Sequence, residues 1–240
     1  MIFRLILCAG LLLSGCAGSR GFDRNAMRAM FHHDRGAVAE QAMTNQPNLP
    51  APLRLAVYFV QKDIPAQHTM RKAEWMATDK DLLISRLASL QNKQILTDPF
   101  LLVDSTIRGS DAQKIRHAAA RYGADMVLIV DGVGSVNRSS NGYAAFYATL
   151  IGAYIAPGTE SDALFMVDGS LWDVRSELLY AARTVEGYSK AVGPAMSVAD
   201  NRVFAQAKVS ALDELGKQMA DQLRRLYGDN SAHERSRTVN

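Results

Sequence analysis

The sequence has few of the features that mark catalytic or nucleic-acid-binding proteins. Its 27 basic and 24 acidic residues give a net charge of only +3, too balanced for a nucleic-acid surface or for attraction to anionic lipid. It contains no P-loop and no Gly-x-Ser-x-Gly nucleophile motif, and Gly132-Val133-Gly134 lacks the third glycine of a dinucleotide site. We therefore expect no nucleic-acid partner, and no motif identifies a catalytic residue.

Metal ligands are also scarce, with five histidines and two cysteines, Cys8 and Cys16. The nearest approach to a metal motif is His32-His33-Asp34, but adjacent side chains diverge on a regular backbone. The other histidines are scattered without ligand spacing. The sequence therefore predicts neither a metal site nor a cofactor.

The N-terminal hydrophobic run, Leu5–Leu13, is too short to span a bilayer as a helix. About nine residues is the size of a signal-peptide core, whereas a membrane helix needs roughly 20. The run follows Arg4 and ends in Leu13-Ser14-Gly15-Cys16, which resembles the lipobox of bacterial lipoproteins at every position. Small residues before the cysteine let an extended backbone enter a peptidase, and the Cys16 thiol can take a thioether-linked diacylglycerol.

This resemblance implies a signal peptide over residues 1–15 and a membrane anchor of palmitate-type acyl chains on Cys16. Ala17 rather than Asp follows the cysteine, which implies the periplasmic face of the outer membrane of a Gram-negative bacterium. Cleavage removes Cys8 and acylation occupies Cys16, so the mature chain would have no disulfide and no free thiol.

Residues 16–52 are small, polar and weakly patterned. We expect them to form the lipidated N-terminus and a flexible tether, with a short helix around Met27–Met43. Three prolines between residues 47 and 52 favour an extended spacer. Such a tether would hold the domain on the order of tens of Å from the bilayer.

Residues 53–228 are predicted to form a single α/β (α+β) domain, with a disordered tail over 229–240. Asp79, Asp111 (or Ser110) and Asp200 are placed to start helices, and Gly123 and Gly228 to end two of them. The pattern predicts a mixed sheet of about five strands covered by helices, the last helix being long. The expected strands are 53–60, 95–103, 125–136, 163–174 and 178–188.

Three segments of this domain carry a family resemblance: Leu55–Val60, Arg121–Leu128 and Trp172–Arg175. They resemble the envelope domain shared by the TolB N-terminal domain, LpoB, CsgG and lipoproteins of the DUF799 kind. Leu150–Thr159 also resembles rhombotarget-type lipoproteins. The hairpin departs from the family, because Ser176 is followed directly by Glu177 without the usual glycine.

The resemblance implies an interaction or assembly module of the cell envelope with no covalent chemistry of its own. Its expected partners are the membrane, through the N-terminal lipid, and envelope proteins of unknown identity, and a homo-oligomer is expected. Two alternatives stay open: a lipid-anchored hydrolase whose site is assembled from distant residues, and a CsgG-like secretion-channel subunit.

The segment most unusual for a soluble domain is 142–157, sixteen residues without a charge. It follows Ser135–Asn141, which is polar and predicted to be a turn. Three interpretations stay open for it: part of the core, a contact surface for a subunit or membrane, or a pore-lining strand. As a contact surface it would act through large apolar and aromatic side chains, for which the candidates are Tyr143, Phe146, Tyr147, Ile151 and Tyr154.

Overall fold

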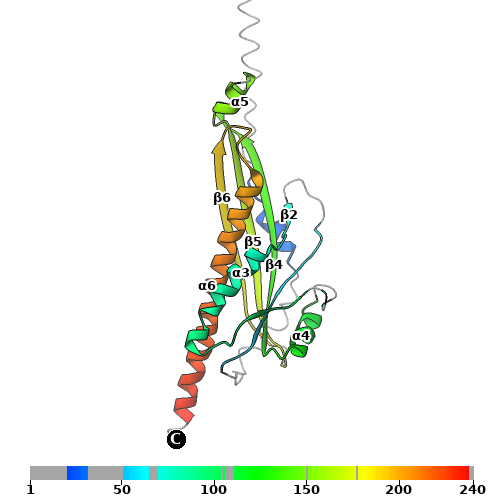
Figure 1. Cartoon of the computed structure of the whole chain (residues 1–240), viewed down its shortest axis with the longest axis vertical. Helices are drawn as coiled ribbons and strands as arrows, with labels where there is room; N and C mark the ends of the chain where they lie inside the picture. The colour runs from blue at the N-terminus through cyan, green and yellow to red at the C-terminus, as the bar shows by residue number, and fades with distance from the viewer. Residues whose placement is uncertain are drawn as a thin grey trace, which may run out of the picture.

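The computed structural model describes residues 21–31, 51–64, 70–103, 105, 107, 111–149, 151–176 and 178–237, with the side chains of 228–237 excepted. These residues form one mixed sheet in the order β3-β1-β4-β5-β6, with β2 also paired to β4 (Figure 1). The strands are β1 (Leu55–Phe59), β2 (Met70–Lys72), β3 (Phe100–Leu101), β4 (Met126–Ser140), β5 (Thr159–Asp173) and β6 (Leu179–Gly193). The helices are α2 (Arg24–Ala29), α3 (Ala77–Ala88), η1 (Gln91–Lys93), α4 (Ala112–Arg121), η3 (Gly142–Ala148), α5 (Gly152–Ile155) and α6 (Asp200–Arg237).

The sheet combines a small parallel part with three long antiparallel strands. β1 pairs in parallel with β3 and β4, as expected for strands joined through helices. β4, β5 and β6 each contain 15 residues and pair antiparallel over nearly their whole length. The β5–β6 turn closes without a glycine because the Asp173 carboxylate accepts backbone hydrogen bonds from Arg175 (2.8 Å) and Ser176 (2.6 Å). The predicted mixed α/β class with a long C-terminal helix is confirmed.

One face of the sheet is covered by α3 and α6, which lie alongside each other in Figure 1. Apolar residues recur at every third or fourth position of α6, so they form one side of the helix that packs on the sheet. The close approach of α6 to β6 requires Gly187. A Cβ at Gly187 would lie 2.1 Å from the Ala207 carbonyl oxygen. Between the two helices the buried Lys208 ammonium lies 2.5 Å from the buried Asp79 carboxylate.

The opposite face is covered by α4 over one half and by α2 over the other. Met27 and Phe31, four residues apart on the chain, are both buried against Val133, Leu164 and Met166. The prediction of a flexible tether over 16–52 is therefore wrong for residues 21–31, because Met27 and Phe31 pack on β4 and β5 and Arg24 and Arg28 pair with Glu186. Residues 32–50 lie outside the described part.

Several predicted element boundaries also change. Asp79 is not the N-cap of α3 but its third residue, and it accepts a hydrogen bond from the Met76 amide (2.8 Å). The strand expected over 95–103 shortens to β3 and one bridge between Leu53 and Leu96. Gly228 does not end the last helix, and the tail predicted to be disordered is helical to Arg237, since glycine costs only about 1 kcal/mol within a helix.

Candidate contact surface at the end of the sheet

The uncharged segment 142–157, called the cap below, connects β4 to β5 beyond the end of the sheet. Ser140 and Thr159 are the last paired residues of the two strands, and η3 and α5 fold on top of them (Figure 1). β4 thus continues through most of Ser135–Asn141, which corrects the predicted turn there. No residue of η3 or α5 is buried, so the interpretation of the cap as core is wrong.

The large apolar side chains of the cap are exposed rather than packed. Tyr143, Phe146, Ile151 and Tyr154, four of the five predicted contact residues, are 59% to 71% exposed. Ile155 belongs with them, although the sequence argument did not include it. Exposed apolar side chains gathered in one place are typical of a surface that binds something.

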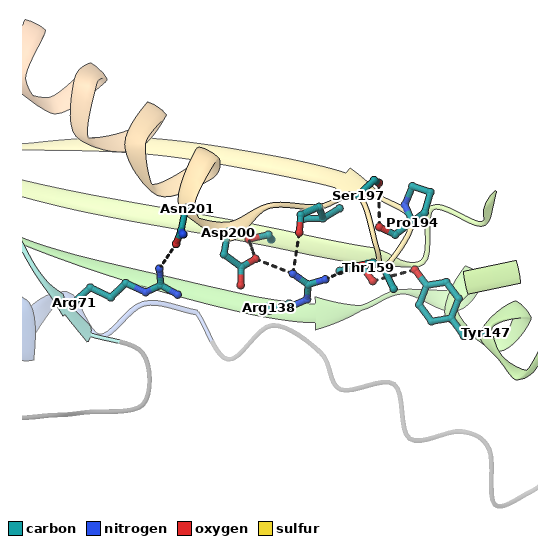
Figure 2. Close-up of polar contacts among 11 residues, drawn as sticks. Arg71, Arg138, Tyr147, Thr159, Pro194, Ser197, Asp200 and Asn201 are labelled. Atoms are coloured by element: carbon teal, nitrogen blue, oxygen red, sulfur yellow. Dashed lines mark hydrogen bonds and ion pairs between the residues drawn. The ribbon is translucent and has the colours of Figure 1, made fainter. Parts of the chain in front are cut away.

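The fifth predicted residue, Tyr147, holds the cap in shape instead of presenting a surface. Its side chain is partly buried, and its hydroxyl lies 2.9 Å from the Thr159 hydroxyl and donates to the Ala156 carbonyl (3.3 Å) (Figure 2). The ring therefore ties η3 to the segment that enters β5. A buried hydroxyl with two partners is the usual arrangement for a tyrosine at the border between apolar and polar surroundings.

Asn141 fastens the other side of the cap. Its side-chain oxygen accepts from the Tyr143 amide (3.0 Å), while its side-chain NH₂ donates to the Pro157 carbonyl (2.9 Å). The turn into α5 further requires Gly152, where a Cβ would lie 1.8 Å from the Phe146 carbonyl oxygen. The cap is thus a fixed, hydrogen-bonded structure, and its exposed side chains are held in place before any partner binds.

The loop between β6 and α6 lies at the same end of the sheet, which we call the cap end. It carries Met196 and follows Val192, both more than half exposed. The Arg138 guanidinium fixes this loop by donating to the carbonyls of Ala195 (2.8 Å) and Val198 (3.1 Å) and to the Asp200 carboxylate (3.0 Å) (Figure 2). No sequence pattern marks this loop, because a lone methionine between Pro194 and α6 has no periodic spacing.

Charges at the cap end are paired with one another. Lys190 donates to Glu160 at 2.7 Å beside the last strand pairs. This hydrogen bond raises the pKa of the Lys190 ammonium, and together with a second one from Asn141 it lowers the pKa of the Glu160 carboxyl. This pair therefore offers no free positive charge to an anionic partner.

A polar depression lies between α3 and α6, away from the cap end. Two cations that line it, Lys217 (2.7 Å) and Arg86 (2.5 Å), pair with Asp213 beside it and lower the pKa of that carboxyl, and Asp221 in the lining pairs with Arg224. Within the described ranges no three metal-ligating side chains come together, and no helix is long and apolar enough to cross a membrane. Leu13, Ser14, Gly15 and Cys16 lie outside the described residues, as does His32-His33-Asp34.

No protein-family model matches the chain, and no curated protein matches it in sequence. Solved structures of similar fold include a Helicobacter pylori protein described as a neuraminyllactose-binding hemagglutinin homolog (14% identity, 77% of this chain and 92% of that one, TM-score 0.43). A second is a minor lipoprotein from Acinetobacter baumannii (15% identity, 72% of this chain and 90% of that one, TM-score 0.34). A third is the PelC dodecamer from Paraburkholderia phytofirmans (16% identity, 74% of this chain and 91% of that one, TM-score 0.32). Identities and scores this low give no information about function.

Proposed function

We propose that the chain is a lipid-anchored, non-catalytic interaction module of the bacterial envelope, and that it makes its principal contact through the cap. The observation that carries the proposal is the set of large apolar side chains held exposed on a rigid, uncharged cap. Exposing them costs the folded protein solvation free energy, which a contact would recover. Attachment through Cys16 would keep the contact at the periplasmic face of the outer membrane.

The two alternatives find less support. A hydrolase needs a concave site with converging polar groups, and the charges that line the polar depression between α3 and α6 are engaged in ion pairs. A channel subunit needs a membrane hairpin of two strands, whereas the cap consists of short helices.

The proposed homo-oligomer rests on a separate feature, the free edge of β6. β6 is the outer strand of the described sheet, and its 15 residues leave a row of backbone groups without a neighbouring strand. A second copy could pair there without involving the cap. Light scattering of the purified lipoprotein in detergent would give its mass: a multiple of the monomer supports this contact, and a monomer at all concentrations refutes it.

Photo-crosslinking in native membranes tests the cap as the contact. A benzophenone amino acid at Tyr154 should crosslink to an envelope component, whereas the same group at Arg175, in the turn at the opposite end of the sheet, should not. Mass spectrometry of the N-terminal peptide should show acyl chains on Cys16. An unmodified Cys16, or equal crosslinking from both positions, would contradict the proposal.

A further inference from the structure

We propose, on the basis of the function above, that the cap contacts the lipid bilayer itself and that the domain stands on the membrane on its cap end. The first support is the direction in which α2 lies on the sheet. At the C-terminal end of α2, the Lys62 ammonium binds the Met30 carbonyl (2.8 Å) and pairs with Asp131 in the middle of β4.

The N-terminal end of α2 lies closer to the cap. Arg24 binds Glu186 (2.9 Å), and the Phe22 ring packs edge-on against Tyr188, with ring centroids 6.4 Å apart. Glu186 and Tyr188 lie progressively further along β6 toward Gly193, where the strand ends beside the cap. From Met30 back to Phe22, the described chain therefore runs toward the cap end.

The length of chain between Gly21 and the anchor at Cys16 limits which end of the domain can meet the membrane. Gly21 is five positions from Cys16, and even a fully extended chain covers only about 18 Å over that interval. The same five-residue distance along β6, from Tyr188 to Gly193, covers about 17 Å. The opposite end of β6, at Leu179, is about 30 Å from Tyr188 in the other direction, beyond the reach of the anchor.

The chemistry of the cap suits the interfacial region of a bilayer. Tyrosine is enriched at the headgroup level of membranes, where its ring can be buried while its hydroxyl stays hydrated, and phenylalanine and aliphatic side chains suit the apolar boundary beneath. The cap presents Tyr143, Phe146 and Tyr154 together with Ile151 and Ile155, and no charge. Because Glu160 and Lys190 at its base neutralise each other, insertion should depend on apolar burial and not on anionic lipid.

A spin label at position 151 measures the depth of the cap directly. The mature chain has no thiol other than the acylated Cys16, so Ile151→Cys introduces a unique labelling site, and Arg175→Cys gives the matched control at the opposite end. Both lipidated full-length variants would be reconstituted in neutral phosphatidylcholine vesicles. At position 151, collisions with a polar nickel complex should fall about tenfold relative to position 175, because hydrocarbon excludes polar solutes, while collisions with oxygen should rise.

The outcomes separate this inference from the function on which it rests. If the protein floats with the vesicles but position 151 stays as accessible to the nickel complex as position 175, the bilayer contact is refuted while anchoring stands. Spin–spin broadening at 151 between protomers would identify a second copy as the occupant and would equally refute it. If Cys16 carries no lipid and the protein does not float, the proposed function itself fails.

Discussion

Replacing Phe146 and Ile151 together with aspartate should leave the folded protein almost as stable as before. The two residues keep 60% and 71% of their surface exposed, so folding removes less than half of either from water. Full burial of a side chain of this size stabilises a protein by about 1.5–3 kcal/mol, so the pair contributes about 1–2 kcal/mol at most. The change should instead abolish the contact that the cap makes.

A matched core substitution calibrates this prediction. Phe165 is fully buried, with its ring against Trp75 and Phe204 at centroid distances of 5.9 and 5.4 Å, so Phe165→Ala should cost about 3–5 kcal/mol. Urea unfolding followed by the fluorescence of Trp75 and Trp172, which are both buried, reports both variants. If the double cap variant lost as much stability as Phe165→Ala, the cap would be part of the core and the reasoning would be refuted.

Gly152→Ala should disturb the cap alone, because the added Cβ would clash with a backbone oxygen of η3. Amide hydrogen exchange should rise within residues 142–157. An equal rise in β4–β6 would contradict this prediction. Asp79→Ala should cost about 3–5 kcal/mol in urea unfolding by leaving the Lys208 ammonium buried without its partner, and adding Lys208→Met should restore most of it. Because the pKa of Glu160 is lowered in the folded state, its bond to Lys190 stabilises the cap base at full strength above the unfolded pKa, and this stabilisation is lost as the pH falls from there through the lowered folded pKa. Protection factors of amides next to the cap, which correct for the intrinsic slowing of exchange in acid, should then fall on acidification, and unchanged protection factors would count against the role given to this pair.

The elements predicted well are those whose pattern is local. α4 has the N-cap Asp111, whose carboxylate accepts from the Gln113 amide (2.9 Å), and is followed by Gly123 with a φ of +69°, as its sequence indicated. α6 buries the apolar stripe that its spacing predicted. The long hairpin was recognisable because alternating residues on both sides of Asp173 are typical of antiparallel strands.

The elements missed are those fixed by distant contacts. β2 has three residues and exists because it pairs with 133–135 of β4, so no pattern of its own marks it. For α2, a short helix around Met27–Met43 was expected, but its docking depends on an apolar hollow formed by β4 and β5. Local spacing does not reveal such contacts, because neither β2 nor α2 would be stable alone.

The cap shows the same limit at the candidate site. An uncharged, aromatic run is equally compatible with a core strand and with an exposed surface, so composition left both open. The structure distinguishes the two possibilities, because β4 continues to Ser140 and β5 begins at Thr159. The whole uncharged run therefore lies beyond the end of the sheet. The role of Tyr147 likewise follows only from its position against Thr159.

Neutron reflectometry of the lipidated protein on a supported bilayer tests the account most directly, because it resolves protein density along the membrane normal. The account predicts that protein density begins within the headgroup layer and that no water layer separates the domain from the bilayer. It also predicts that the protein density extends from the bilayer over a distance equal to the long axis of the sheet, since the cap end faces the bilayer. A water gap on the order of tens of Å, as a flexible tether would allow, or a domain lying flat would contradict it.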